Sequence, residues 1–256
     1  MDFYSEFSKN YDKIFPLNSK KLNLIDNTFK GLKEKKKEIK LLDVGCGTGS
    51  YALKLAEKGY QVKAIDLDAE MISLAESKMK DARVEVDFYR IGMLNLKKKF
   101  KRASFDGIYI IGNVLVHLTK EGIKDFLDLA AEILKEEGKI FIQIVNYNRI
   151  LELDLDGLPT IYSKDDSVRF ERNYEYNEKE NILYFKTRLI DHFDDQLLSE
   201  NKIELYPLCK SELEDYLKEA GFKVEKIYGS PVGDHYRELS SIPLLITAKK
   251  AEQKSG

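Results

Sequence analysis

The feature that constrains this chain most is a short apolar run that leads directly into three glycines. Residues 39–44 are mostly apolar, and Gly45, Gly47 and Gly49 follow at every second position. Glycine has no Cβ, so the backbone can turn tightly there and come close to a ligand. A helical pattern begins at Ser50, and a helix N-terminus carries unpaired N–H groups. The sequence therefore predicts a strand, a glycine turn and a helix that form a cofactor site.

Strand-like and helix-like segments alternate along the first part of the chain. Several of the strand-like segments are apolar throughout, which is typical of parallel strands covered on both faces. The pattern therefore predicts an α/β fold with a doubly wound sheet. Helices are expected within residues 1–38, with a break at Pro16, over 50–58 and 69–80, and from Thr119 to a stop at Gly138. Strands are expected over residues 40–44, 61–65, 84–89, 107–111 and 139–145.

The pattern changes at about residue 148. Residues 167–193 alternate as in an antiparallel hairpin, around a polar turn at 177–181, and a further strand is expected over 202–208. The tetrad at 211–214 is typical of a capping box that opens a helix. Two last strands are expected over 223–228 and 242–249.

This change predicts three parts of the chain. Residues 1–149 and 209–250 form the cofactor-binding core, and residues 150–208 form an inserted antiparallel lid over the acceptor site. Residues 251–256 form a frayed tail. An insertion at this point is an ordinary place for a substrate lid.

Composition and charge narrow the class of protein. The 256 residues carry a formal net charge of -2, whereas a dedicated nucleic-acid binder usually has a strongly basic domain. No apolar run approaches the length needed to span a membrane, and the first residues lack the apolar run of a signal peptide. The only two cysteines, Cys46 and Cys209, have no metal-ligand spacing. We expect a cytoplasmic protein without a metal site.

Two cofactor classes compete for the glycine turn. A dinucleotide fingerprint needs a third glycine where Ser50 stands. Asp43 lies two residues before the first glycine, where its charge would repel a pyrophosphate. S-adenosylmethionine carries a sulfonium and an α-amino group but no phosphate, so Asp43 favours this cofactor. Asp66, at the end of the second strand, can accept hydrogen bonds from the ribose hydroxyls.

The segment at residues 41–49 resembles the first motif of class I S-adenosylmethionine-dependent methyltransferases. Residues 62–66, 105–111 and 137–142 resemble the later motifs of that family, in the same order. The resemblance implies a Rossmann-like sheet of seven mostly parallel strands, with helices on both faces and an antiparallel β insertion as a lid. Gly92 stands where the family usually has an acid for the adenine amino group. The implied cofactor-binding residues are Tyr11, Asp43, Gly45, Cys46, Gly47, Gly49, Asp66, Leu67, Met71, Gly92, Met93, Leu94, Ile111 and Asn113.

Within that family, residues 111–118 and 145–151 are similar to the glycine N-methyltransferase type of small-molecule enzymes. Val145 stands where those enzymes have an arginine for the substrate carboxylate, which argues against glycine as the substrate. Alternative anchors are Arg149, Arg169, Arg172 and Arg188. The implied substrate-binding residues are Asn113, His117, Asn146, Tyr147, Tyr162 and Tyr206, of which His117 and Tyr206 are the catalytic candidates.

The resemblance implies methyl transfer to a nitrogen, or to an oxygen, of a small-molecule acceptor by in-line displacement. A nucleic-acid or protein methyltransferase is one alternative, but the Asn-Pro-Pro-Tyr type of motif is absent after the fourth strand. A non-catalytic protein that binds S-adenosylmethionine is the other alternative. No nucleic-acid or membrane partner is expected, and the sequence is silent on oligomeric state.

Overall fold

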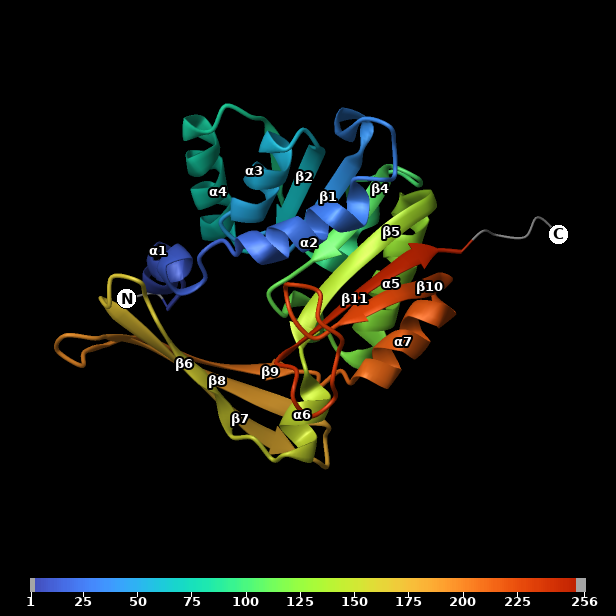
Figure 1. Cartoon of the computed structure of the whole chain (residues 1–256). Coiled ribbons are helices and arrows are strands. Elements are labelled where there is room, and N and C mark those ends of the chain that lie inside the picture. Colours follow the sequence, from blue (N-terminus) through green and yellow to red (C-terminus); the bar gives the residue numbers. More distant parts are fainter. Residues whose placement is uncertain (1–2, 252–256) are drawn as a thin grey trace.

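The chain folds into a seven-stranded sheet with helices on both faces and a separate four-stranded sheet (Figure 1). The computed structural model describes residues 3–251, with side chains from Glu6 onward. Apart from Ala251, the expected tail of residues 251–256 lies outside the described residues. Within residues 3–251, no helix is long and apolar enough to cross a membrane.

The large sheet confirms the expected topology. Its order is β10-β11-β5-β4-β1-β2-β3. The strands β1 to β5 run parallel to one another, while β11 is antiparallel to both β5 and β10. Its strands are β1 (Lys40–Val44), β2 (Gln61–Asp66), β3 (Val86–Arg90), β4 (Phe105–Ile110), β5 (Leu134–Val145), β10 (Phe222–Tyr228) and β11 (Pro243–Lys250).

Helices bury their apolar faces on the two sides of this sheet. The α-helices are α1 (Phe3–Ile14), α2 (Ser19–Phe29), α3 (Ser50–Glu57), α4 (Ala69–Asp81), α5 (Lys120–Ile133), α6 (Tyr147–Glu152) and α7 (Lys210–Glu219). Three short 3-10 helices are η1 (Lys36–Glu38), η2 (Met93–Lys98) and η3 (Val114–His117).

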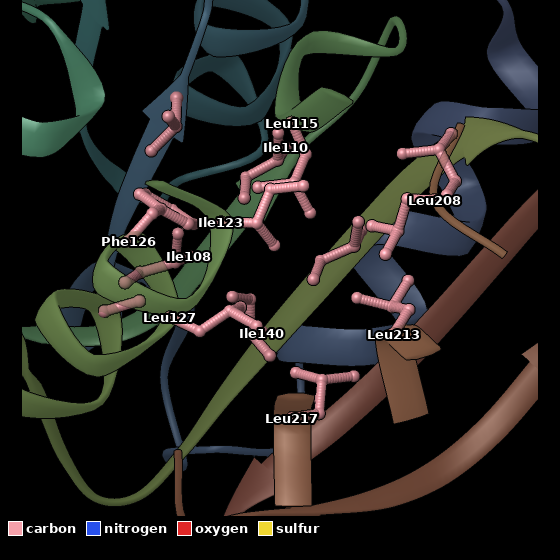
Figure 2. Close-up of a cluster of buried hydrophobic side chains, with 14 of the residues drawn as sticks. Ile108, Ile110, Leu115, Ile123, Phe126, Leu127, Ile140, Leu208, Leu213 and Leu217 are labelled. Atoms are coloured by element: carbon pink, nitrogen blue, oxygen red, sulfur yellow. The ribbon is translucent and has the colours of Figure 1, made fainter. Parts of the chain in front are cut away.

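Two buried clusters hold the helices to the sheet. Figure 2 shows Ile123 and Phe126 of α5 with Leu213 of α7, all in one cluster with Ile108 of β4 and Ile140 of β5. A second cluster joins side chains of α2 and α3 to the other face of β1 and β4. Ligands of such sheets bind at the edge where the carboxyl ends of the parallel strands lie.

The four-stranded sheet is the expected lid. It has the order β6-β7-β8-β9, and each strand is antiparallel to the next. Its strands are β6 (Gly157–Tyr162), β7 (Val168–Asn177), β8 (Ile182–Asp191) and β9 (Leu197–Leu205). Figure 1 places this sheet on the side of the core where β5 runs into α6, with α1 toward one end and α6 toward the other.

The helix after Thr119 ends earlier than the sequence indicated. Thr119 caps it, as expected, but α5 stops at Ile133 and β5 begins at the next residue. Gly138 is therefore not the helix stop. It lies where the pairing of β5 with β4 shifts its register, and a Cβ there would be 2.8 Å from the Lys135 carbonyl oxygen.

Other element boundaries also differ from the expectation. The predicted capping box at 211–214 is wrong by two residues, because α7 begins at Lys210 and its N-cap is Cys209, whose N–H donates to Glu212 Oε2 at 3.3 Å. The strand expected at 202–208 begins at Leu197. The short elements β6, α6 and η2 carry too few periodic positions to be recognised from the pattern.

Candidate functional site

The glycine turn lies at the carboxyl end of β1 and holds all three glycines in the left-handed region. Their φ values are 73°, 53° and 74°, which an L side chain rarely adopts. A Cβ on Gly45 would lie 2.6 Å from Val114 Cγ1, and one on Gly49 would lie 2.8 Å from the Phe88 ring. Gly49 is the N-cap of α3, so the N–H groups at the start of that helix border the turn.

Asp43 is a buried carboxyl group directly below the turn. Its side chain is 1% exposed, and Oδ1 has no hydrogen-bond partner within residues 3–251. The hydroxyl of Tyr109, on the adjacent position of β4, also lacks a partner with hydrogen-bond geometry. Burial raises the pKa of Asp43 to about 8; the nearby Tyr109 hydroxyl opposes this rise, and the neighbouring Asp66 carboxylate adds to it. A buried carboxyl group with one oxygen left unbonded is a poor structural group but a good site for a cation.

Asp66 ends β2 beside the same turn. Its two carboxylate oxygens accept hydrogen bonds from the backbone N–H groups of Gly47, at 2.8 Å, and Asp68, at 3.0 Å. Burial raises the pKa of Asp66, while these backbone hydrogen bonds oppose the rise. Each oxygen keeps a further lone pair for a ligand hydroxyl. Cys46 lies within the turn, and burial raises the pKa of its thiol well above the usual value, so it stays protonated.

Helix α1 lies over the turn. A Cβ on Gly47 would be 3.4 Å from the Tyr11 ring, so this ring faces the turn as the resemblance implied. The carboxylate of Asp12 accepts hydrogen bonds from the hydroxyls of Thr48, at 2.7 Å, and Ser50, at 3.2 Å. A carboxylate at this place also lies favourably beside the N-terminus of α3.

Several of the implied cofactor-binding residues lie on the elements that follow β2, β3 and β4. Leu67 is 71% exposed, and its Cδ1 would be 3.6 Å from a Cβ on Gly92. Met93 and the exposed Leu94 open η2, and Met71 is buried in the first turn of α4. Ile111, just beyond β4, is buried in the cluster that packs on α2 and α3.

Asn95 is a polar residue in this region that the sequence analysis did not identify. Its backbone N–H donates to the Gly92 carbonyl at 2.9 Å, and this turn of η2 brings its amide nitrogen to 3.7 Å from a Cβ on Gly92. An asparagine amide can pair with the donor and acceptor of an adenine edge. Asn95 can therefore supply the polar contact that Gly92 lacks, although no motif marks it in the sequence.

Lys21 is a second residue that the sequence analysis did not identify. From α2, its Nζ donates to Gln143 Oε1 at 2.9 Å, and the same oxygen accepts the N–H of Gly112 at 3.1 Å, just beyond β4. Burial lowers the pKa of Lys21 to about 8. A half-buried ammonium group at this edge, with only a neutral partner, suits the carboxylate of an amino-acid ligand.

Asn113 and Tyr147 meet on the acceptor side of the turn. Asn113 Nδ2 donates to Tyr147 Oη at 2.9 Å, and Asn113 Oδ1 accepts the Val145 N–H at 2.9 Å. Asn113 has a φ of 70° and is the N-cap of η3. Val114, the next residue after Asn113, packs against Gly45, so Asn113 and Tyr147 lie next to the glycine turn.

The structure does not gather the other acceptor-side residues around that pair. Asn146 is buried and fully bonded within the protein, because its amide donates to the carbonyls of Glu238 and Ser241 and its oxygen accepts from Arg149 and Tyr236. Such bonding leaves it no free group for a ligand.

Three further candidates also point to other surroundings. Tyr206 Oη donates to Glu212 Oε1 at 2.6 Å, toward α7. Tyr162 is 53% exposed, and its ring lies against His192 of the lid. His117 ends η3 with an exposed side chain.

These contacts fit S-adenosylmethionine. The left-handed glycines keep the turn free of side chains, Asp43 offers a buried carboxyl group for an ammonium group, and Asp66 offers acceptors for ribose hydroxyls. Lys21 can face a carboxylate. Among the described residues, no group of three or more His, Cys, Asp or Glu side chains could hold a metal ion.

Comparisons with known proteins agree with this reading of the site. Residues 41–138 match the family model described as a methyltransferase domain. A provisionally named methyltransferase of Geobacillus sp. (strain WCH70) is 28% identical over 193 residues, which cover 73% of this chain and 75% of that protein. The glycine/sarcosine N-methyltransferase of Aphanothece halophytica is 26% identical over 196 residues, which cover 74% of this chain and 68% of that protein.

Solved structures share this fold. The crystal structure of an S-adenosylmethionine-dependent methyltransferase from Clostridium acetobutylicum ATCC 824 superposes with a TM-score of 0.78. The superposition covers 98% of this chain and all of that chain, at 18% sequence identity.

Proposed function

Since this chain is an S-adenosylmethionine-dependent methyltransferase, we propose that it methylates a nitrogen atom of a small-molecule acceptor. An oxygen acceptor is the near alternative. The relative from Aphanothece halophytica is an N-methyltransferase, which supports a nitrogen acceptor.

The observation that carries the proposal is the way the four-stranded sheet is attached to the core. Phe170 of β7 packs on Phe7 of α1 and on Phe15 just beyond it, at ring distances of 5.5 Å and 5.7 Å. At the other end of this sheet, Tyr174 and Leu183 join the cluster that contains Tyr147. The sheet is therefore held at both ends, and we infer that it restricts the acceptor to a small molecule rather than a folded protein or a nucleic-acid duplex.

On the donor side, we assign four contacts to residues of the core. Asp43 holds the cationic amino group, Lys21 the carboxylate and Asp66 the ribose hydroxyls. Asn95 contacts the adenine edge, together with the apolar surface of Leu67. Bound S-adenosylmethionine supplies an electrophilic methyl group on a sulfonium.

On the acceptor side, Asn113 and Tyr147 position the acceptor next to the glycine turn. The acceptor must present a neutral nitrogen with a free lone pair; the new N–C bond forms as the C–S bond breaks, and the product nitrogen then releases a proton. His117 stays our candidate to receive it, since its exposed ring can pass the proton to water. Tyr206 and Tyr162 stay candidates as apolar walls, because the Tyr206 hydroxyl is engaged by Glu212.

The proposal extends to the division of the chain and to its setting. We assign residues 150–208 to acceptor choice and residues 1–149 and 209–250 to the cofactor. Cys46 and Cys209 are both free thiols, which suits the reducing cytoplasm.

The test is methyl transfer from radiolabelled S-adenosylmethionine, at a concentration below saturation, to a metabolite extract, with the Asp66→Ala variant as a control whose cofactor binding is weakened. Labelled small molecules that form faster with the unaltered chain than with Asp66→Ala would support the proposal. Label in protein or RNA would favour a macromolecular acceptor instead. Tight cofactor binding with no labelled product would indicate a non-catalytic binding protein.

A further inference from the structure

A row of polar side chains crosses the inner face of the lid. In β7, Phe170, Arg172 and Tyr174 lie on the same face, because every second side chain of a strand points to the same side. Phe170 packs on α1 and Tyr174 packs in the main cluster around Tyr147. Arg172 lies between them, so its side chain faces the gap between α1 and α6.

The neighbouring strands continue this row. Arg172 pairs with Thr187 of β8, and Thr187 pairs with Asn201 of β9. Ser199, two residues along the same face of β9, has a buried hydroxyl without a partner. Polar groups in the middle of an otherwise apolar inner face are costly to bury unless they meet a polar ligand.

Arg172 differs from the other arginines that could serve as an anchor. Arg169 pairs with Glu171 at 3.4 Å and with Asp195 at 2.5 Å, and Arg188 pairs with Glu171 at 3.1 Å. Arg172 forms no salt bridge within the described residues; its Nη2 donates to the Pro159 carbonyl, and its buried Nε–H has no partner. A guanidinium group in this position lacks a counter-charge.

A cavity of about 470 Å³ opens beside Arg172. It is lined by Arg149 of α6, by residues 155–160, which include Asp156 and the start of β6, and by Glu171, Arg172 and Asn173 of β7. Glu171 is already paired with Arg169 and Arg188. The cavity volume is in the range of small-molecule sites. Helix α6 carries both Arg149 and, two residues before it, Tyr147, which bonds to Asn113 beside the glycine turn.

We propose that Arg172 is the anion-binding residue of the acceptor subsite, and that the acceptor carries a carboxylate group. The inference rests on the proposed function and names the class of its substrate. A guanidinium edge matches the two oxygens of a carboxylate. One buried guanidinium balances one negative charge, so a monoanionic carboxylate fits better than a phosphate dianion. With Arg172 in this role, the substrate carboxylate needs no arginine at the position of Val145.

The test compares Arg172→Met with Arg188→Met, a matched control on the adjacent strand whose native side chain is paired and exposed on the outer face. The first readout is the thermal unfolding temperature, measured with saturating S-adenosylhomocysteine at equal ionic strength. The added compounds are three carboxylates (acetate, butyrate and phenylacetate), the corresponding amides, and phosphate. The second readout is transfer of a labelled methyl group to a panel of amino acids and to their carboxamides.

We expect the carboxylates, but not the amides, to raise the unfolding temperature of the unaltered chain and of Arg188→Met. In Arg172→Met this rise should disappear, and kcat/KM for amino-acid acceptors should fall roughly 10- to 100-fold, the scale of a lost charged hydrogen bond. The preference for acid over amide should also fall, which loss of the Pro159 contact alone would not cause. Unchanged cofactor affinity shows that Arg172→Met is folded.

The outcomes separate the inference from the proposed function. Equal transfer to carboxylate-bearing acceptors by the unaltered chain and Arg172→Met would overturn the inference and leave the proposed function standing. Stabilisation by phosphate rather than carboxylates would also overturn it. Carboxylate binding that depends on Arg172, without transfer to any acceptor, would support the subsite and overturn the proposed function.

Discussion

Cofactor binding should release a proton from Asp43. In the ligand-free chain, burial raises the pKa of Asp43 to about 8, so about nine in ten of these groups are protonated at pH 7. A bound ammonium group favours the charged carboxylate and should lower this pKa well below 7. The cofactor's own α-amino group, with a usual pKa near 7.7–8.0, should take up only about 0.1 proton at pH 7. The net release is therefore about 0.8 proton per cofactor bound.

This release has a consequence for affinity. Ionising Asp43 costs about 1.4 kcal/mol at pH 7. At pH 6 the cost is larger by about a further 1.4 kcal/mol. The dissociation constant of S-adenosylmethionine should therefore rise close to tenfold from pH 7 to pH 6. Above about pH 9 the ammonium group itself loses its proton, so binding should take up a proton there.

Calorimetry in phosphate and in Tris measures the release, because the two buffers differ in their enthalpy of ionisation. Asp43→Asn is the matched control; asparagine resembles the protonated acid, so the variant should fold and bind without releasing a proton. Release below about 0.2 proton at pH 7, or equal release by Asp43→Asn, would show that Asp43 does not face the ammonium group.

Other parts of the site give further predictions. Asp66→Ala should weaken cofactor binding by roughly 1–3 kcal/mol in calorimetry, the scale of lost charged hydrogen bonds, and unchanged affinity would contradict the ribose assignment. Lys21→Met should raise the free energy of unfolding at pH 7 by up to about 3 kcal/mol in denaturant titrations, because the folded-state pKa is about 8 and the unfolded-state pKa about 10.5. That gain should shrink as pH rises from 8 to 10.5, and an equal gain at both ends would exclude Lys21 as its cause. Asn95→Ala should weaken binding of S-adenosylhomocysteine more than binding of its analogue without the adenine amino group, and equal losses would place Asn95 outside the adenine contact. Gly45→Ala should lower the unfolding temperature, because its Cβ would meet Val114 Cγ1 at 2.6 Å in a left-handed backbone; an unchanged temperature would contradict that packing.

The sheet and its glycine turn could be predicted because their signals are local. The apolar strands and Gly45, Gly47 and Gly49 each follow from a short stretch of sequence, and the structure confirms the strand, turn and helix that they form. The end of α5 could not be read in this way. Gly138 looks like a helix stop, but its role comes from the strand pairing and from the Lys135 carbonyl oxygen, which leaves no room for a Cβ at this position.

The acceptor side was less predictable for a related physical reason. A side chain's role there depends on partners far away in the sequence. Asn146 and Tyr206 match the pattern of acceptor-contacting residues, yet Ser241 and Glu212 already engage their polar groups. Arg172, one of four equivalent candidates in the sequence, stands out only after the pairing of β7 shows which face it occupies.

The contacts of α1 have a consequence for the order of kinetic steps. Tyr11 faces Gly47 and also packs against Phe7 and Phe15, which contact Phe170 of the lid. A displacement of α1 on cofactor entry would therefore also change the contacts of the lid. We expect a compulsory order, with the methyl donor binding first and its demethylated product leaving last. In steady-state inhibition, that product should compete with the donor and show a mixed pattern against the acceptor.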